Sequence, residues 1–180
     1  MKRSKKMVLV AHCLLNTNAK VLGISTVEGA TPIIEQFIRK GYGIIQLPCI
    51  EMAMFGSQRW GIVYDQCDFP NFREKCRELL LPIVDQVQDY MNKGYEIAGI
   101  VGVDGSPTCA VNITVSGAWG GELSGDTTYL NSIQSLEKRR GMGVMMEELN
   151  FLLKDRDLKI PFYALDEEDM SSGKEILNFF

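Results

Sequence analysis

The sequence predicts an α/β fold, a Rossmann-like or flavodoxin-like three-layer sandwich in which helices cover both faces of a short parallel sheet. Two observations lead to this fold class: short apolar runs alternate with segments of helical periodicity, and turn residues bound each run. Strands that alternate with helices form parallel βαβ units with right-handed crossovers. The sequence contains no repeat, low-complexity tract or linker, so we expect a single domain over residues 1–180.

Four apolar runs are the expected strands, and helical patterns separate them. The expected strands are Met7–His12, Gly43–Leu47, Ile97–Val103 and Ile160–Leu165. Thr31 is expected as an N-cap, with Pro32 at the first helical position and Gly41 closing that helix. A second helix over 68–94 carries a 3.6-residue apolar stripe, and Pro82 is expected to kink or split it.

A third helical pattern covers residues 132–153, with glycine breaks and an apolar face rich in methionine. Methionine at this spacing is typical of a packed core rather than of a cofactor site. The basic sequence EKRR at 137–140 is expected on the solvated face of a helix. A short final helix, capped by Ser171 or Ser172, is expected to dock at the C-terminus.

Two connecting segments, residues 50–69 and 110–131, are too long for plain connectors. Both are rich in glycine, serine and aromatic residues. Long loops in a small α/β domain are typically binding loops or lids. A contact between two copies of the chain is an equally good interpretation of their length.

Charge and hydropathy bound the partners and the location. The net charge is −4, and no segment carries a basic stripe, so we expect no nucleic-acid partner. No apolar run reaches the roughly 20 residues that cross a bilayer, so we expect no membrane partner. The start MKRSKK is basic, but the short run after it is broken by His12 and lacks a cleavage site. A cytoplasmic location is therefore expected.

Three of the five cysteines directly follow the first three expected strands. Cys13, Cys49 and Cys109 each stand a short turn beyond an apolar run. Because ligands bind at the shared C-terminal edge of parallel strands, we expect these thiols to converge on one crevice. Cys76 lies on the apolar stripe of the second helix and is expected in the core. Cys67 falls in a polar loop. We interpret it as an incidental thiol, and the less favoured alternative is a fourth metal ligand.

Three thiolates suit soft metal chemistry. A 4Fe–4S cluster held by only three cysteines leaves one iron open to substrate, and that iron can act as a Lewis acid. Zinc held by three cysteines is the competing metal site. Three buried structural cysteines are the alternative without a metal, because the dispersed spacing matches no fixed motif.

The segments AHCLL, LPCIE and GSPTC, one at the end of each of the first three strands, resemble the motifs of the thiouracil desulfidase family. The motifs of that family run approximately A-C-L-L-G, C-P-E and G-S-P-S-C, in this order and at similar separations. The resemblance spans residues 7–112. The ordered set of three motifs is more specific than any one of them.

This resemblance implies an iron–sulfur-dependent desulfidase that removes sulfur from a small thiolated compound by non-redox hydrolysis. The implied ligands of a 4Fe–4S cluster are Cys13, Cys49 and Cys109. The implied catalytic acid is Glu51, two positions after the second cysteine, where it is placed for proton transfer. Ser106, in the third motif, is the implied donor to substrate or sulfide, and a plain turn residue is the alternative.

Several positions depart from the family pattern, so the chemistry is expected to carry over while the substrate differs. His12 replaces a small residue before the first cysteine, Ile50 replaces a proline, and Ala110 replaces a glycine. The family's Arg-Tyr-Asp-Gly segment is absent, and the chain reads NTNAKVLG instead. His12 is expected to be structural. Arg59 is expected to be a solvated surface arginine, with substrate orientation as the alternative.

Two other functions use the same thiols. A non-catalytic metal or small-molecule sensor module predicts binding without turnover. A sulfurtransferase with a persulfide on Cys109 or Cys49 predicts activity in a colourless, iron-free protein. The desulfidase predicts an oxygen-sensitive chromophore together with turnover. The residues do not predict the identity of the thiolated substrate or the oligomeric state.

Overall fold

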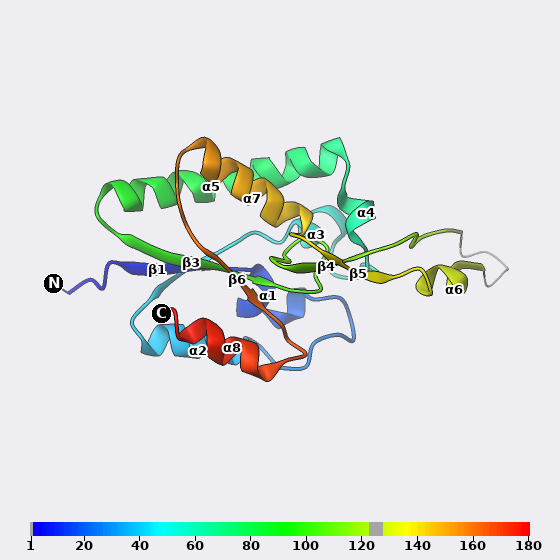
Figure 1. Cartoon of the computed structure of the whole chain (residues 1–180), viewed down its shortest axis with the longest axis horizontal. Coiled ribbons are helices and arrows are strands. Elements are labelled where there is room, and N and C mark those ends of the chain that lie inside the picture. Colours follow the sequence, from blue (N-terminus) through cyan, green and yellow to red (C-terminus); the bar gives the residue numbers. More distant parts are fainter. Residues whose placement is uncertain (1, 123–127) are drawn as a thin grey trace.

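A four-stranded parallel sheet forms the centre of the computed structural model, which describes residues 2–122 and 128–180 (Figure 1). The strand order is β2-β1-β3-β6, and every pairing in this sheet is parallel. The strands are β1 (Lys6–Val10), β2 (Gly43–Gln46), β3 (Glu96–Val103) and β6 (Phe162–Leu165). Each overlaps one of the four apolar runs, so the predicted parallel sheet is confirmed.

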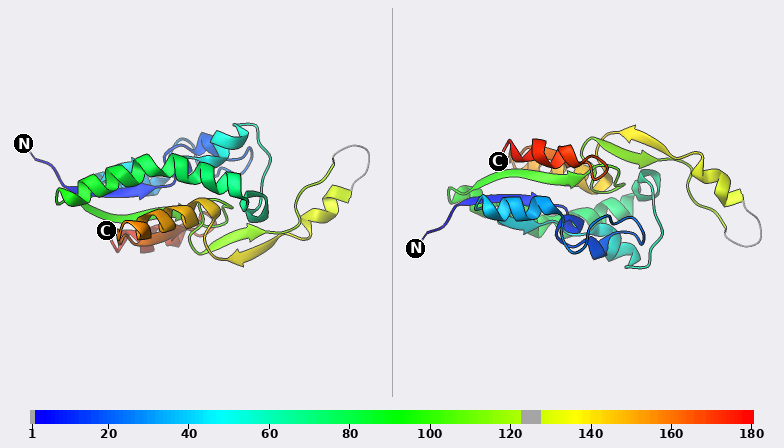
Figure 2. Two further views of the ribbon diagram at one scale, coloured as in Figure 1. Left: turned by 90° about the horizontal axis from the view of Figure 1, so that it is seen from above. Right: turned by 90° about the horizontal axis from the view of Figure 1, so that it is seen from below.

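The larger helices cover both faces of this sheet (Figure 2). On one face α5 (Pro70–Asn92) packs beside α7 (Val144–Asp155), and on the other α2 (Pro32–Arg39) packs beside α8 (Met170–Leu177). Val8, Leu9 and Ile100 are fully buried between these layers. The Rossmann-like three-layer arrangement predicted from the sequence is therefore confirmed.

Short helical elements lie in the segments that follow β1 and β2. They are α1 (His12–Leu15), η1 (Thr17–Ala19), α3 (Ile50–Phe55) and α4 (Tyr64–Cys67). The prediction of one long loop over residues 50–69 was wrong, because α3 and α4 lie within this segment. Both helices are shorter than two turns. A helix this short contains too few residues for its apolar periodicity to be recognised in a sequence.

An arm extends from the body of the protein (Figures 1 and 2). It consists of the antiparallel pair β4 (Ile113–Ser116) and β5 (Glu137–Arg140), followed outward by α6 (Thr128–Ile133). The predicted helix over 132–153 was wrong for residues 137–140, which form β5, although α7 covers residues 144–153. The prediction that the EKRR segment is helical was wrong for the same reason. Pairing with β4 holds residues 137–140 extended. The prediction of one long loop over residues 110–131 was also wrong, because β4 and the start of α6 lie within it; residues 123–127 lie outside the described part.

Three local predictions have mixed outcomes. α5 runs through Pro82 as one helix, so a split there was wrong. Thr31 occupies the N-cap of α2, but its hydroxyl donates to the Leu14 carbonyl at 3.0 Å and accepts no hydrogen bond from a helix N–H group. The cap of α8 is Asp169, whose carboxylate accepts the Ser171 N–H. A carboxylate there also suits the helix dipole.

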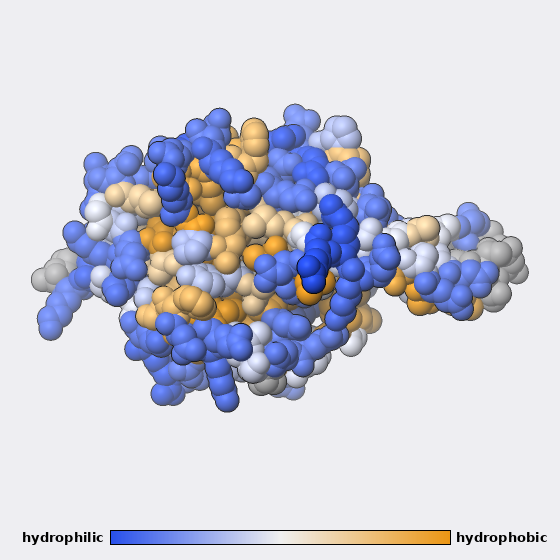
Figure 3. All heavy atoms as spheres, in the orientation of Figure 1, coloured by the Kyte–Doolittle hydropathy of each residue, from blue (hydrophilic) through white to orange (hydrophobic). Residues whose placement is uncertain are grey.

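Apolar surface gathers in a band between α7 and α8, where the edge strand β6 crosses the face shown in Figure 3. Hydrophilic residues surround this band. Among the described residues, no helix combines the length and the apolar composition that spanning a membrane requires.

Candidate functional site

Three cysteines line one cavity of about 250 Å³ at the C-terminal edge of the sheet. Cys13 lies in α1 just after β1, Cys49 is the N-cap of α3 after β2, and Cys109 follows the turn after β3. These three strands are neighbours in the sheet, so their ends meet. The structure thus brings together the three thiols that were expected to converge.

The turn that carries Cys109 folds back tightly over β3. The Val103 N–H donates to the Cys109 carbonyl at 2.9 Å. A Cβ at Gly102 would stand 2.3 Å from that same carbonyl oxygen, so only glycine allows this approach. The Ser106 hydroxyl oxygen accepts the Cys109 N–H at 3.0 Å, and Asp104 accepts the N–H of Val111. The DGSPT sequence therefore builds a rigid platform for the third thiol.

Burial keeps these thiols protonated. It raises the pKa of Cys13 from the ordinary 9.0 to about 12. The same cause raises the pKa of Cys49, and it raises that of Cys109 well above 9.0. Interactions with Cys13 and with the Glu51 carboxylate raise the pKa of Cys109 further, as expected for side chains that share a cavity. Metal binding at this site would displace protons, because the thiolate is the ligand.

Glu51 lies in the same cavity and is held from two sides. Its Oε2 accepts a hydrogen bond from Arg59 Nε at 3.0 Å, and its Oε1 accepts one from the Thr108 hydroxyl at 2.7 Å. Arg59 is also buried and donates from Nη2 to the Ala19 carbonyl at 2.8 Å. The expectation that Arg59 is a solvated surface residue was therefore wrong.

A second ion pair lines the cavity and was missed from the sequence. Lys20 Nζ lies 2.5 Å and 2.6 Å from the two carboxylate oxygens of Glu167, and 5% of the Lys20 side chain is exposed. The Lys20 charge acts to lower the pKa of Cys13. Glu167 follows the fourth strand, so the strand-end rule that found the thiols could have found it. Lys20 stands in the NTNAKVLG segment, where the family resemblance fails.

The remaining predicted residues divide between the cavity and the core. Ser106 lines the cavity, with its oxygen engaged by backbone N–H groups. His12 also lines it, and its Nδ1 lies 2.7 Å from Gln46 Nε2. Cys67 and Cys76 are fully buried in the hydrophobic core. Core placement confirms the prediction for Cys76, whereas the polar loop expected around Cys67 was wrong.

Within the described residues, no three histidine, cysteine, aspartate or glutamate side chains converge on one metal ion. A single tetrahedral zinc ion with Zn–S bonds of about 2.3 Å would need its sulfurs roughly 3.8 Å apart. An iron–sulfur cluster binds each thiolate at a different iron atom, so its ligands stand further apart. The lack of a single-ion geometry among the described residues is therefore compatible with a cluster.

The fold and site define an α/β protein of Rossmann-like fold with a thiol-lined cavity at the C-terminal edge of its sheet. Over 110 residues the chain is 36% identical to the uncharacterized protein MJ0003 of Methanocaldococcus jannaschii, a match that covers 61% of this chain and 70% of that protein. The chain belongs to the same family as MJ0003. No family model matches the sequence, and no solved structure matches it.

Proposed function

We propose that the protein is an iron–sulfur-dependent desulfidase that hydrolyses a carbon–sulfur bond of a small thiolated compound. One observation carries this proposal: three thiols, each in the segment that follows one of three adjacent strands, line a cavity that also contains a buried carboxylate, Glu51. The ordered motifs that resemble the thiouracil desulfidases support it.

The donor set fits a 4Fe–4S cluster with three protein ligands. Cys13, Cys49 and Cys109 are soft donors, and His12 is already engaged with Gln46. When bound, the cluster would supply one iron without a cysteine ligand, a Lewis acid for the sulfur of the substrate. We also propose a cytoplasmic location, where thiols stay reduced.

Glu51 is the residue that we assign to proton transfer. A carboxylate has about four lone-pair sites, and the hydrogen bonds from Arg59 and Thr108 use two of them. Oxygens Oε1 and Oε2 can therefore still accept a hydrogen bond from water in the cavity. Glu51 would take a proton from the attacking water and return it to the leaving group, while Arg59 and Thr108 fix its orientation.

The protonated thiols weigh against the sulfurtransferase alternative. A persulfide carrier needs a reactive thiolate, which proteins obtain by lowering a cysteine pKa. Here burial raises the pKa of Cys49 and of Cys109. Metal coordination removes those protons as the site is filled, so the same burial is compatible with a cluster.

Anaerobic purification followed by iron and acid-labile sulfide analysis tests the proposed function. We expect brown protein with close to four irons per chain, as a 4Fe–4S centre requires, and sulfide release from 2-thiouracil or a related thiolated compound. Colourless protein that binds zinc stoichiometrically and cannot be reconstituted with iron and sulfide would rule the desulfidase out.

A further inference from the structure

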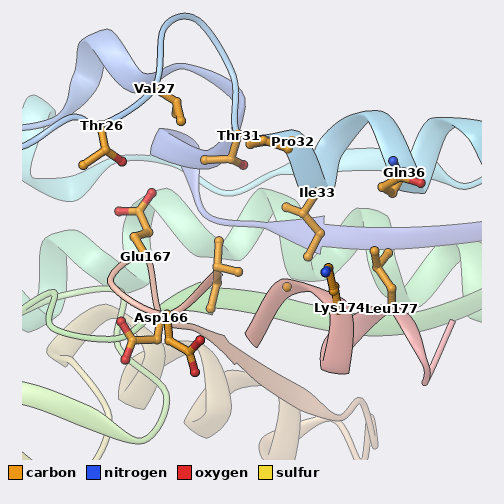
Figure 4. A pocket seen from close by; sticks show the side chains of 13 residues that line it. Thr26, Val27, Thr31, Pro32, Ile33, Gln36, Asp166, Glu167, Lys174 and Leu177 are labelled. Carbon is orange, nitrogen blue, oxygen red and sulfur yellow. The ribbon is translucent and has the colours of Figure 1, made fainter. Parts of the chain in front are cut away.

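A second cavity, of about 420 Å³, lies between α2 and α8 (Figure 4). Its walls are mainly apolar side chains from both helices, from the loop before α2 and from the end of β6. These side chains are Val27, Pro32, Ile33, Leu165 and Leu177. A volume of this size, with apolar walls and a few polar groups, is typical of a small-molecule site, for which about 300–1,000 Å³ is usual.

A glycine in the middle of α8 keeps this cavity open. Gly173 lines the cavity, although glycine destabilises a helix interior relative to alanine. Its backbone does not require glycine, because its φ lies outside the left-handed region and a Cβ would only touch Leu165 Cδ1 at 3.5 Å. A larger side chain at this position would occupy the space between the helices.

Charged groups of opposite sign mark the two ends of the cavity. In Figure 4, Asp166 and Glu167 stand at one end and Lys174 at the other. Glu167 is paired with Lys20. By contrast, no lysine or arginine in the described part of the chain forms an ion pair with Asp166 or Asp169, which both line the cavity. Carboxylates beside apolar walls complement a ligand that carries a positive charge.

We propose that this cavity binds a small organic cation, with an apolar body between α2 and α8 and an ammonium or amidinium group at Asp166. Lys174 is exposed and stands at the opposite end, so it does not compete for that carboxylate. Glu167 lines both this cavity and the thiol cavity, so the two sites share a wall. The proposed cation site does not depend on the desulfidase function.

Three probes of similar shape and different charge test the ligand class: 2-phenylethylammonium, 2-phenylethanol and 3-phenylpropionate. Their binding to the full chain is measured by isothermal titration calorimetry. We expect saturable one-to-one binding of the ammonium probe, about fivefold tighter than the alcohol, because a partly buried carboxylate adds a modest attraction. The carboxylate probe should bind most weakly. No saturable ammonium binding, or tightest binding of the carboxylate, overturns the proposal.

Two variants locate the site. Gly173→Leu should weaken ammonium binding by about tenfold or more, because the new side chain fills the cavity. Glu175→Leu adds the same side chain at an exposed position of α8 and should bind like the native chain. Unchanged ammonium binding by Gly173→Leu would place the site elsewhere and overturn the proposal.

Asp166→Asn removes the negative charge of this side chain while nearly preserving its shape, so it tests whether the charge causes the preference for the ammonium probe. An asparagine oxygen can still accept the Glu168 N–H, which Asp166 Oδ1 accepts at 2.9 Å. We expect this variant to bind the alcohol normally and to lose the preference for ammonium. A preference that survives in Asp166→Asn contradicts the assigned contact, and this result decides the matter even where Gly173→Leu fails to fold.

Discussion

Arg59 Nε stands 3.0 Å from Glu51 Oε2, and both side chains are almost wholly buried beside three thiols. Removing two charges from water is unfavourable unless each finds a partner with good geometry. Arg59 meets that condition through Glu51 and the Ala19 carbonyl, and Glu51 through Arg59 and Thr108. The pair therefore fixes a carboxylate at one defined place in the cavity.

Glu51→Gln tests the assigned proton transfer. Glutamine keeps the size and the acceptor oxygen but cannot exchange the proton. We expect sulfide release to fall by about a hundredfold to ten-thousandfold, with normal colour and iron content. Glu175→Gln, at an exposed position of α8, is the matched control and should be fully active. If Glu51→Gln releases sulfide normally, the base lies elsewhere, and His12 is the next residue to replace.

The Arg59–Glu51 pair should show strong energetic coupling. Arg59→Met leaves Glu51 buried without its cation and should lower the free energy of unfolding by about 3–5 kcal/mol. When Arg59→Met is combined with Glu51→Gln, the added Glu51→Gln change should lower the free energy of unfolding much less than it does alone, because no unpaired charge remains. Urea unfolding of the two single variants and the double variant measures this. Strictly additive effects would show that the two side chains act independently.

Single replacements should separate the cavity cysteines from the core cysteines. Cys13→Ser, Cys49→Ser and Cys109→Ser should each lose most of the bound iron, since a hydroxyl is a poor substitute for thiolate. Cys76→Ala and Cys67→Ala should keep the iron and lose only packing energy. Iron analysis and visible absorption report the result. Iron loss in either core variant would contradict the assigned ligand set.

The metal-free protein should lose stability at alkaline pH. Burial raises the pKa of Cys13 from 9.0 to about 12, so the folded state binds protons more tightly than the unfolded state. That contribution is complete below pH 9.0 and is lost as pH rises toward 12. The free energy of unfolding of the metal-free chain should therefore fall across this range. Cys13→Ser should show a shallower decline, and an equal decline would assign the effect to other groups.

Gly102→Ala should disturb the third thiol without touching it. The new Cβ would stand 2.3 Å from the Cys109 carbonyl oxygen, so the turn after β3 must shift. We expect a loss of about 1–3 kcal/mol in the free energy of unfolding, as for other overpacked sites, together with weaker iron binding. Gly173→Ala is the control and should keep its stability and iron content, because a Cβ there makes only an ordinary contact of 3.5 Å with Leu165 Cδ1. Native iron content in Gly102→Ala would contradict this account.

The sequence by itself determined the sheet and the convergence of the thiols. A strand of a buried parallel sheet is an apolar run between turn residues, and this local signal is legible at β1, β2, β3 and β6. Parallel strands place their C-terminal ends at one edge. The positions of Cys13, Cys49 and Cys109 therefore followed from the order of the elements, before any contact between them was known.

Tertiary structure alone decided the contacts between distant segments. Residues 137–140 have no strand character of their own, and only pairing with β4 makes them β5. Arg59 is buried where it meets Glu51 of α3 and the Ala19 carbonyl, and Lys20 meets Glu167 across 147 positions of sequence. Such contacts depend on strand register and on helix packing, which the local periodicity of a sequence does not encode.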